Sequence, residues 1–220
     1  MAKEKRIGVV LSGCGYLDGA EIQEATLTLL ALDRRGAKAV AMAPDVDQAD
    51  VVHHVSGEPR GEKRNVLAEA ARIARGQVVD LAQVRAADLD GLIFPGGYGA
   101  AKNLCTFARD GARLQVNPDV ERLVRELRQA GKPMGFICIA PAIAAKVLGG
   151  EQVQLTIGND PDTAKALEAL GAKHLCRGVD EIAVDERLKV VSTPAYMLGP
   201  SIAPVAAGID KLVAAVVELA

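Results

Sequence analysis

Residues 131–141 read Gly-Lys-Pro-Met-Gly-Phe-Ile-Cys-Ile-Ala-Pro, and this stretch decides the fold. Met134–Ile137 form a short apolar run, which is typical of a strand buried in a parallel sheet. The run ends at Cys138, and Pro141 then opens a helical pattern, since proline is tolerated in the first turn of a helix. A strand that turns sharply into a helix exposes one side chain at the edge of the sheet. We therefore expect Cys138 to stand at such an edge.

Short apolar runs alternate with helical periodicity along the rest of the chain as well. We expect strands at 7–11, 37–43, 91–94, 153–157, 182–184 and 188–192, and helices at 20–35, 66–75, 118–129 and 201–219. This alternation predicts an α/β sandwich of three layers, a mainly parallel sheet with helices on both faces. The polar stretch 44–65 lies outside the pattern. We expect it to be a family-specific excursion within a single domain of residues 1–220.

Composition and charge exclude several classes of protein. Half of the residues are apolar and the formal net charge is −2, so the chain lacks the basic footprint expected for nucleic acid or an anionic membrane. Val190–Ile209 carry no charge, but three prolines and two glycines argue against a membrane helix there. We expect no nucleic-acid and no membrane partner. In this aromatic-poor chain we expect a small, polar pocket.

Four cysteines are spread along the chain without the spacing of a zinc site or a disulfide framework: Cys14, Cys105, Cys138 and Cys176. The first residues contain no apolar signal region. We expect free thiols in a reducing, cytoplasmic location, with no metal and no cofactor. Cys138 alone precedes a helix start, whose partial positive charge is expected to lower the thiol pKa.

Two further loops should meet Cys138, because the carboxyl ends of parallel strands lie at one edge of a sheet. One is the glycine turn Pro95-Gly-Gly. The amides of Gly97 and Ile139 could converge there on an oxyanion. The other loop leads to the helix that carries Glu24, which has two interpretations. Glu24 is either a solvated residue at the helix start or, beneath Cys138, a buried acid/base with a raised pKa.

Three more residues are candidates for the lining of a pocket. Cys14, in a Ser-Gly-Cys-Gly turn, either fills a tight loop or acts as a resolving thiol for oxidised Cys138. Asn103 and Tyr196 either line the pocket or serve packing or a dimer contact.

The motifs around these residues resemble the PfpI/ThiJ superfamily, relatives of the class I glutamine amidotransferases, and within it the enhancing-lycopene-biosynthesis branch. The resemblance covers nearly the whole chain and rests on the stretches 8–15, 18–24, 64–67, 94–104, 131–141, 155–158 and 193–198. It implies a flavodoxin-like sandwich and a homodimer. It also implies that Cys138 is the nucleophile, that Glu24 hydrogen-bonds it, and that the Gly97 and Ile139 amides form the oxyanion hole.

The activity implied by the resemblance is that of a cofactor-independent glyoxalase acting on small dicarbonyls, glyoxal and methylglyoxal, without glutathione or a metal. The branch name suggests a link to isoprenoid biosynthesis. A second hypothesis is a redox-sensing or regulatory binding protein in which Cys138 is oxidised, with little catalysis.

Peptidase and glutaminase activities are disfavoured by the histidines. Protease-like members place a histidine directly after the nucleophile, and amidotransferases place a His-x-Glu farther on, whereas Ile139 follows Cys138 here. Beyond it the sequence contains only His174, which we expect to be structural. His53 and His54 lie in the polar excursion, and the sequence assigns them no role.

Overall fold

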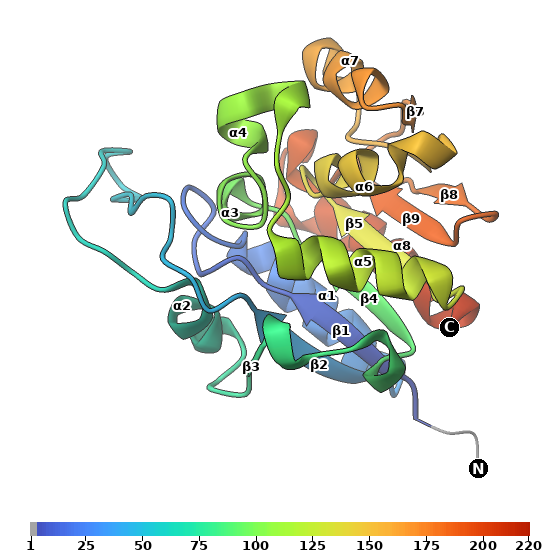
Figure 1. Cartoon of the computed structure of the whole chain (residues 1–220), viewed down its shortest axis with the longest axis horizontal. Helices are drawn as coiled ribbons and strands as arrows, with labels where there is room; N and C mark the ends of the chain where they lie inside the picture. The colour runs from blue at the N-terminus through green and yellow to red at the C-terminus, as the bar shows by residue number, and fades with distance from the viewer. Residues whose placement is uncertain (1–3) are drawn as a thin grey trace.

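The computed structural model describes residues 4–220, most of which form one sheet flanked by helices (Figure 1). The strands are β1 Arg6–Val10, β2 Lys38–Ala43, β3 Val79–Asp80, β4 Gly91–Phe94, β5 Met134–Ile137, β6 Gln154–Leu155, β7 Lys173–His174, β8 Ala183–Asp185 and β9 Val190–Thr193. The α-helices are α1 Ile22–Arg34, α2 Val66–Ile73, α3 Tyr98–Lys102, α4 Phe107–Asp110, α5 Pro118–Gln129, α6 Pro141–Leu148, α7 Pro161–Ala169 and α8 Ile202–Leu219. Short 3-10 turns are η1 Leu81–Gln83, η2 Ala86–Asp88, η3 Gly111–Arg113, η4 Gly149–Glu151 and η5 Ala195–Met197.

The main sheet has seven strands in the order β3-β2-β1-β4-β5-β9-β8. All neighbours pair in parallel except β8 and β9, which are antiparallel. From β1 the chain winds toward β2 and β3 on one side, and β4 then begins the other side. A ligand site in such a sheet lies outside the carboxyl ends of the strands where the winding reverses. The loops after β1 and β4 are therefore the first place to look for a site.

Helices cover both faces of this sheet, and each face has its own apolar core. One core lies against α1, α2 and α8 and contains Leu32, Ile209 and Val213. The other lies against α5 and α6 and contains Leu123 and Ile143. In Figure 1, α5 crosses in front of the sheet while α1 and α8 lie behind it. The predicted α/β sandwich with a mainly parallel sheet is confirmed.

The strand expected at 153–157 does not join the main sheet. Its ordered part, β6, pairs only with β7 in a separate two-stranded sheet. Amides of this segment instead donate hydrogen bonds to side chains of the main sheet. Asp185 Oδ2 accepts from Gln154 N at 2.9 Å, and Ser192 Oγ accepts from Thr156 N at 2.9 Å. Backbone pairing with β8 or β9 is thus replaced by side-chain hydrogen bonds.

Two other segments were singled out by the sequence. Residues 44–65 contain no helix or strand, and two isolated bridges, Asp47 to Asn65 and Val52 to Pro59, hold them together. The uncharged run that starts at Val190 becomes β9, a turn and the first part of α8. No helix within residues 4–220 has both the length and the apolar character needed to cross a membrane.

Candidate functional site

Cys138 stands at a strained turn between β5 and α6. Its φ angle is 62°, in the left-handed region, while its amide still donates to Thr193 O of β9 at 3.0 Å. Ala195, just beyond the end of β9, also has a positive φ of 45°. A non-glycine residue in this region costs about 1–3 kcal/mol, and such strain gathers at functional sites. The two strained residues belong to segments that follow neighbouring strands.

The glycine turn after β4 lies directly against Cys138. A Cβ atom added to Gly96 would come within 2.4 Å of Cys138 Cβ and 2.7 Å of Glu24 Oε2. No side chain fits in that space. Gly97, with φ 92°, turns the chain into α3. Glycine at these two positions is what allows three loops to meet at one point.

Glu24 lies in the first turn of α1 and is completely buried. Its Oε2 accepts a hydrogen bond from Gly96 N at 2.8 Å, and its Oε1 accepts one from Tyr196 N at 3.2 Å. Burial raises the pKa of Glu24 to about 7, with Glu21 adding to the rise and the Tyr196 amide opposing it. The solvated interpretation of Glu24 is wrong, because the carboxyl is held beneath Cys138 by residues from three separate loops.

Cys138 is 7% exposed, and both Cys138 Cβ and Glu24 Oε2 lie directly against Gly96. Burial raises the pKa of Cys138, the negative charge of Glu24 raises it further, and the amides of Gly97 and Ile139 act in the opposite direction. The expectation that the start of α6 lowers this thiol pKa is therefore wrong. Desolvation of a thiolate outweighs the partial charge of a helix end. The raised pKa keeps the Cys138 thiol neutral at rest.

The amides of Gly97 and Ile139 both face the sulfur, since each favours the thiolate form of Cys138. Within residues 4–220 neither amide donates to a backbone carbonyl. Two unused donors at a nucleophilic atom can stabilise negative charge on the sulfur or on an oxygen bonded next to it. The structure thus brings together the four residues that the sequence singled out as nucleophile, carboxyl and oxyanion donors.

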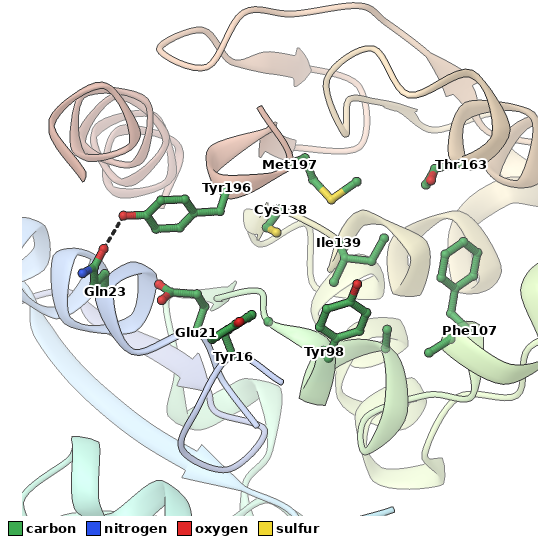
Figure 2. Close-up of a pocket in the computed structure, with 13 residues that line it drawn as sticks. Tyr16, Glu21, Gln23, Tyr98, Phe107, Cys138, Ile139, Thr163, Tyr196 and Met197 are labelled. Atoms are coloured by element: carbon green, nitrogen blue, oxygen red, sulfur yellow. Dashed lines mark hydrogen bonds between the residues drawn. The ribbon is translucent and has the colours of Figure 1, made fainter. Parts of the chain in front are cut away.

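A cavity of about 680 Å³ opens beside Cys138 (Figure 2). It is lined by Tyr16, Glu21, Gln23, Gly97, Tyr98, Ala101, Phe107, Ala108, Cys138, Ile139, Thr163, Tyr196 and Met197. Tyr196 lies here as expected, and its hydroxyl donates to Gln23 Oε1. The sequence analysis missed Gln23, Phe107 and Thr163, because α1, α4 and α7 bring them to the cavity from distant parts of the chain. The position of Tyr98 directly after the glycine turn could have identified it as a lining residue, because that turn was expected beside Cys138.

Cys14 does not line this cavity. It is half-buried, and the nearby charges that act on its thiol belong to Glu69, Arg72 and Asp18. Two of these residues are on α2, so the Cys14 side chain lies toward that helix. Burial raises the pKa of Cys14. The pocket position proposed for Cys14 is wrong. The argument that Cys14 is a resolving thiol depended on that position and no longer applies.

Asn103 also stays outside the cavity and instead ties loops together. Its Nδ2 donates to Ser12 O and Asp18 O, both at 2.9 Å, and its Oδ1 accepts from Ala49 N at 2.9 Å. These bonds join the loop after β1 to the excursion at 44–65. The pocket-lining interpretation of Asn103 is wrong, and packing is the correct alternative.

The histidines are occupied by local hydrogen bonds. His54 Nε2 accepts from Leu17 N at 3.3 Å, His174 Nε2 accepts from Ile157 N at 3.3 Å, and His53 is bound within its own turn. Among the described residues none of the cavity-lining side chains is a histidine. No group of three or more His, Cys, Asp or Glu side chains in residues 4–220 could hold a metal ion.

The fold and the site define an α/β domain with a cysteine at a sharp turn from a strand into a helix, and comparisons with known proteins identify its family. The chain is 50% identical to the human glutamine amidotransferase-like class 1 domain-containing protein 3, mitochondrial, over 97% of this chain and 83% of that protein. It is 38% identical to the zebrafish (Danio rerio) ES1 protein, mitochondrial, over 87% of this chain and 76% of that protein. The chain belongs to this glutamine amidotransferase-like class 1 family.

Comparison with solved structures shows which known folds this chain shares. The isoprenoid biosynthesis protein with an amidotransferase-like domain from Ehrlichia chaffeensis superposes with a TM-score of 0.91 at 37% identity, over 98% of this chain and 99% of that one. A ThiJ/PfpI domain protein from Brachyspira murdochii gives a TM-score of 0.60 at 15% identity, over 99% and 97% of the two chains. The second likeness shows the fold alone. No protein-family model matches the chain. The predicted flavodoxin-like fold and the predicted relation to the class I glutamine amidotransferases are confirmed.

Proposed function

We propose that this protein is a glutathione-independent glyoxalase that converts a 1,2-dicarbonyl, such as glyoxal or methylglyoxal, into the 2-hydroxy acid. The observation that carries the proposal is that Cys138 and the buried Glu24 carboxyl both lie directly against Gly96, next to two amides that donate to no backbone carbonyl. Such a site holds a nucleophile, one acid/base and an oxyanion hole. These are the groups needed to move a proton between adjacent carbons.

In the first step Cys138 Sγ forms a bond to the aldehyde carbon as the C=O π bond breaks. Glu24 takes the thiol proton, for which a carboxyl with a pKa of about 7 is suited near neutral pH. The oxygen becomes an oxyanion that the amides of Gly97 and Ile139 stabilise. Return of the proton from Glu24 to this oxygen gives a hemithioacetal.

In the second step Glu24 removes the proton on the carbon bonded to sulfur, which gives an enediol. Reprotonation at the neighbouring carbon yields a thioester of the 2-hydroxy acid, so one carbon is oxidised and the other reduced within the same molecule. Water then cleaves the carbon–sulfur bond, releasing the acid and restoring the Cys138 thiol. Glyoxal plus water becomes glycolic acid, and no external oxidant or reductant enters the balance.

The same geometry weighs against the alternative of a redox sensor. Oxidation requires an exposed thiolate of low pKa, whereas Cys138 is buried and its pKa is raised. Peptidase and glutaminase activities lack a histidine base beside the thiol. The glyoxalase proposal uses the raised pKa of Glu24, which the other two do not need.

We propose further that the protein acts as a homodimer in the cytoplasm on a small dicarbonyl, with neither a metal nor another cofactor. The curated relatives cited above carry the word mitochondrial in their names, and the name of the Ehrlichia protein supports a proposed link to isoprenoid biosynthesis. Sedimentation velocity tests the dimer directly, because a single species at monomer mass across a range of concentrations would contradict it.

The decisive test is turnover of glyoxal and methylglyoxal by wild type and by Cys138→Ala. We expect the substitution to lower kcat/KM by at least about 100-fold, because it removes the nucleophile. Cys176→Ala is the matched control, since that cysteine is exposed and outside the cavity, and it should retain wild-type turnover. Full activity of Cys138→Ala would sink the proposal. Selective oxidation of Cys138 by peroxide in intact-mass spectra, with negligible turnover, would favour the sensor.

A further inference from the structure

The aromatic residues of this chain are gathered at the cavity. The sequence has three tyrosines, three phenylalanines and no tryptophan, and all three tyrosines together with Phe107 line the cavity. The other two phenylalanines, Phe94 and Phe136, stack on each other in the core with 4.9 Å between their ring centroids. Tyr16 and Tyr98 are 48% and 52% exposed, so their rings are accessible to a ligand. The expectation of a small, polar pocket is wrong.

The cavity is larger than a two-carbon dicarbonyl requires. Its volume of about 680 Å³ lies within the range of cavities that bury drug-sized ligands. A water molecule occupies about 30 Å³ of liquid, so the cavity has room for roughly twenty waters, and glyoxal would fill a small part of it. Figure 2 shows Phe107 and Thr163 on the opposite side of Cys138 from Gln23. The space therefore extends beyond the reacting sulfur toward α4 and α7.

Apart from the amides of Gly97 and Ile139, which the carbonyl oxygen would occupy under the proposed function, the wall of the cavity offers no partner to a permanent negative charge. Among the described residues that line it there is no Lys, Arg or His, and Glu21 is the one carboxylic acid. The nearby cations already have anionic partners: Lys102, which lies over the Tyr98 ring, pairs with Asp50, and Arg109 pairs with Asp110. Glu21 Oε2 already accepts from Glu24 N at 2.6 Å and so occupies the start of α1. An anionic substituent would face a carboxyl without compensation.

We propose that the carbonyl compound bound here carries an aromatic ring and no negative charge, with phenylglyoxal as the simplest member of the class. The inference rests on the proposed function, because it places the aldehyde carbon at Cys138. The ring would then lie between Tyr98 and Phe107, where offset or edge contacts between rings are favourable. Addition of water through the steps above converts phenylglyoxal into mandelic acid with the same balance of atoms and electrons.

The first experiment measures binding and does not depend on turnover. Benzamidine, benzamide and benzoate share one shape and differ in charge, and isothermal titration or ligand-observed NMR compares their affinities for the wild-type protein. We expect benzamide and benzamidine to bind at least about tenfold more tightly than benzoate. Phe107→Ala should weaken benzamide binding by roughly three- to tenfold. Val55→Ala is the control, because Val55 is 92% exposed and does not line the cavity. Benzoate binding as tight as benzamide, or no binding by any of the three, would overturn the inference.

The second experiment compares kcat/KM for phenylglyoxal and glyoxal. We expect phenylglyoxal to be preferred, and Phe107→Ala to lower the ratio of the two values by roughly three- to tenfold. Turnover of glyoxal in preference to phenylglyoxal would overturn the substrate class while leaving the glyoxalase proposal intact. Turnover of neither compound, together with tight benzamide binding, would overturn the glyoxalase proposal and keep the aromatic, uncharged ligand class.

Discussion

At the scale of single residues, the site depends on a buried carboxyl that lies beneath a buried thiol. Glu24 is buried with two amides on its oxygens, and Cys138 stands above it in a left-handed conformation. The negative charge of Glu24 raises the pKa of Cys138, whereas Cys138 acts to lower the pKa of Glu24. Under the proposed function, this arrangement lets Glu24 act as a base near neutral pH and keeps Cys138 protonated until a carbonyl arrives. Reactivity at this site is therefore a property of the pair.

The raised pKa of Glu24 predicts a pH-dependent loss of stability. The folded state holds the proton up to about pH 7, whereas an unperturbed glutamate releases it near 4.5. Stabilisation by protonated Glu24 is thus fully present below pH 4.5 and is lost as the pH rises through about 7. Relative to Glu24→Gln, the unfolding free energy of wild type should fall by about 2–3 kcal/mol between about pH 5 and pH 8.

Chemical denaturation at several pH values measures this difference. Glu58→Gln, at an exposed position, controls for the general loss of a carboxyl. A difference between wild type and Glu24→Gln that stays constant across the pH range would contradict the raised pKa.

At the scale of elements, loops are joined to one another by side chains whose partners lie far along the chain. Glu24 receives amides from the turn after β4 and from the turn after β9, and Asn103 joins the loop after β1 to the excursion at 44–65. Gly96 permits the close approach of the β4 and β5 ends. The site is a junction of loops positioned by a rigid sheet.

Asn103→Ala tests this junction. The substitution leaves the Ala49 amide and two carbonyls without their partner, which should cost about 1–3 kcal/mol of unfolding free energy. Hydrogen exchange should quicken in residues 44–65 while protection in β4 and β5 is retained. Asn103→Asp keeps an acceptor for Ala49 N and loses the two donated bonds, so it separates the two contributions. Unchanged exchange in 44–65 in Asn103→Ala would show that other contacts hold the excursion.

At the scale of the whole molecule, the two apolar cores are built almost entirely from aliphatic side chains, whereas all three tyrosines line the cavity. Aliphatic side chains fill both layers at the sheet, and the stacked pair Phe94 and Phe136 is the aromatic part of the core. The division is not complete, because Phe107 and Tyr196 also pack against the two cores.

This division predicts that intrinsic fluorescence reports on the cavity. Since the chain has no tryptophan, emission excited near 280 nm comes from the tyrosines, all of which line the cavity. Saturation with benzamide should change that emission along the same binding curve that calorimetry gives. Emission that stays constant at saturation would place the ligand elsewhere. Free N-acetyltyrosinamide at matched absorbance serves as the control for light absorbed by the ligand.

Local signals in the sequence determined most of the architecture. The apolar runs at 91–94 and 134–137 and the helical pattern at 118–129 predicted β4, β5 and α5 with the bounds found in the structure. Runs of apolar residues, prolines at helix starts and glycines at turns act over a few residues, so they can be identified without knowing the fold. For the same reason the meeting of Cys138 and Gly97 at one edge was predictable from strand ends. The residues left two alternatives open for Glu24, and the resemblance implied the one beneath Cys138.

Only the tertiary structure decided what those residues are able to do. The pKa directions of Glu24 and Cys138 follow from burial by the turn after β4 and by Tyr196, 172 positions away from Glu24. The departure of β6 from the sheet, the place of Cys14 beside α2 and the aromatic wall of the cavity also arise from long-range contacts. Desolvation depends on every atom that surrounds a group, whichever part of the chain supplies it. A sequence shows which residues carry chemistry, and packing sets the state in which they carry it.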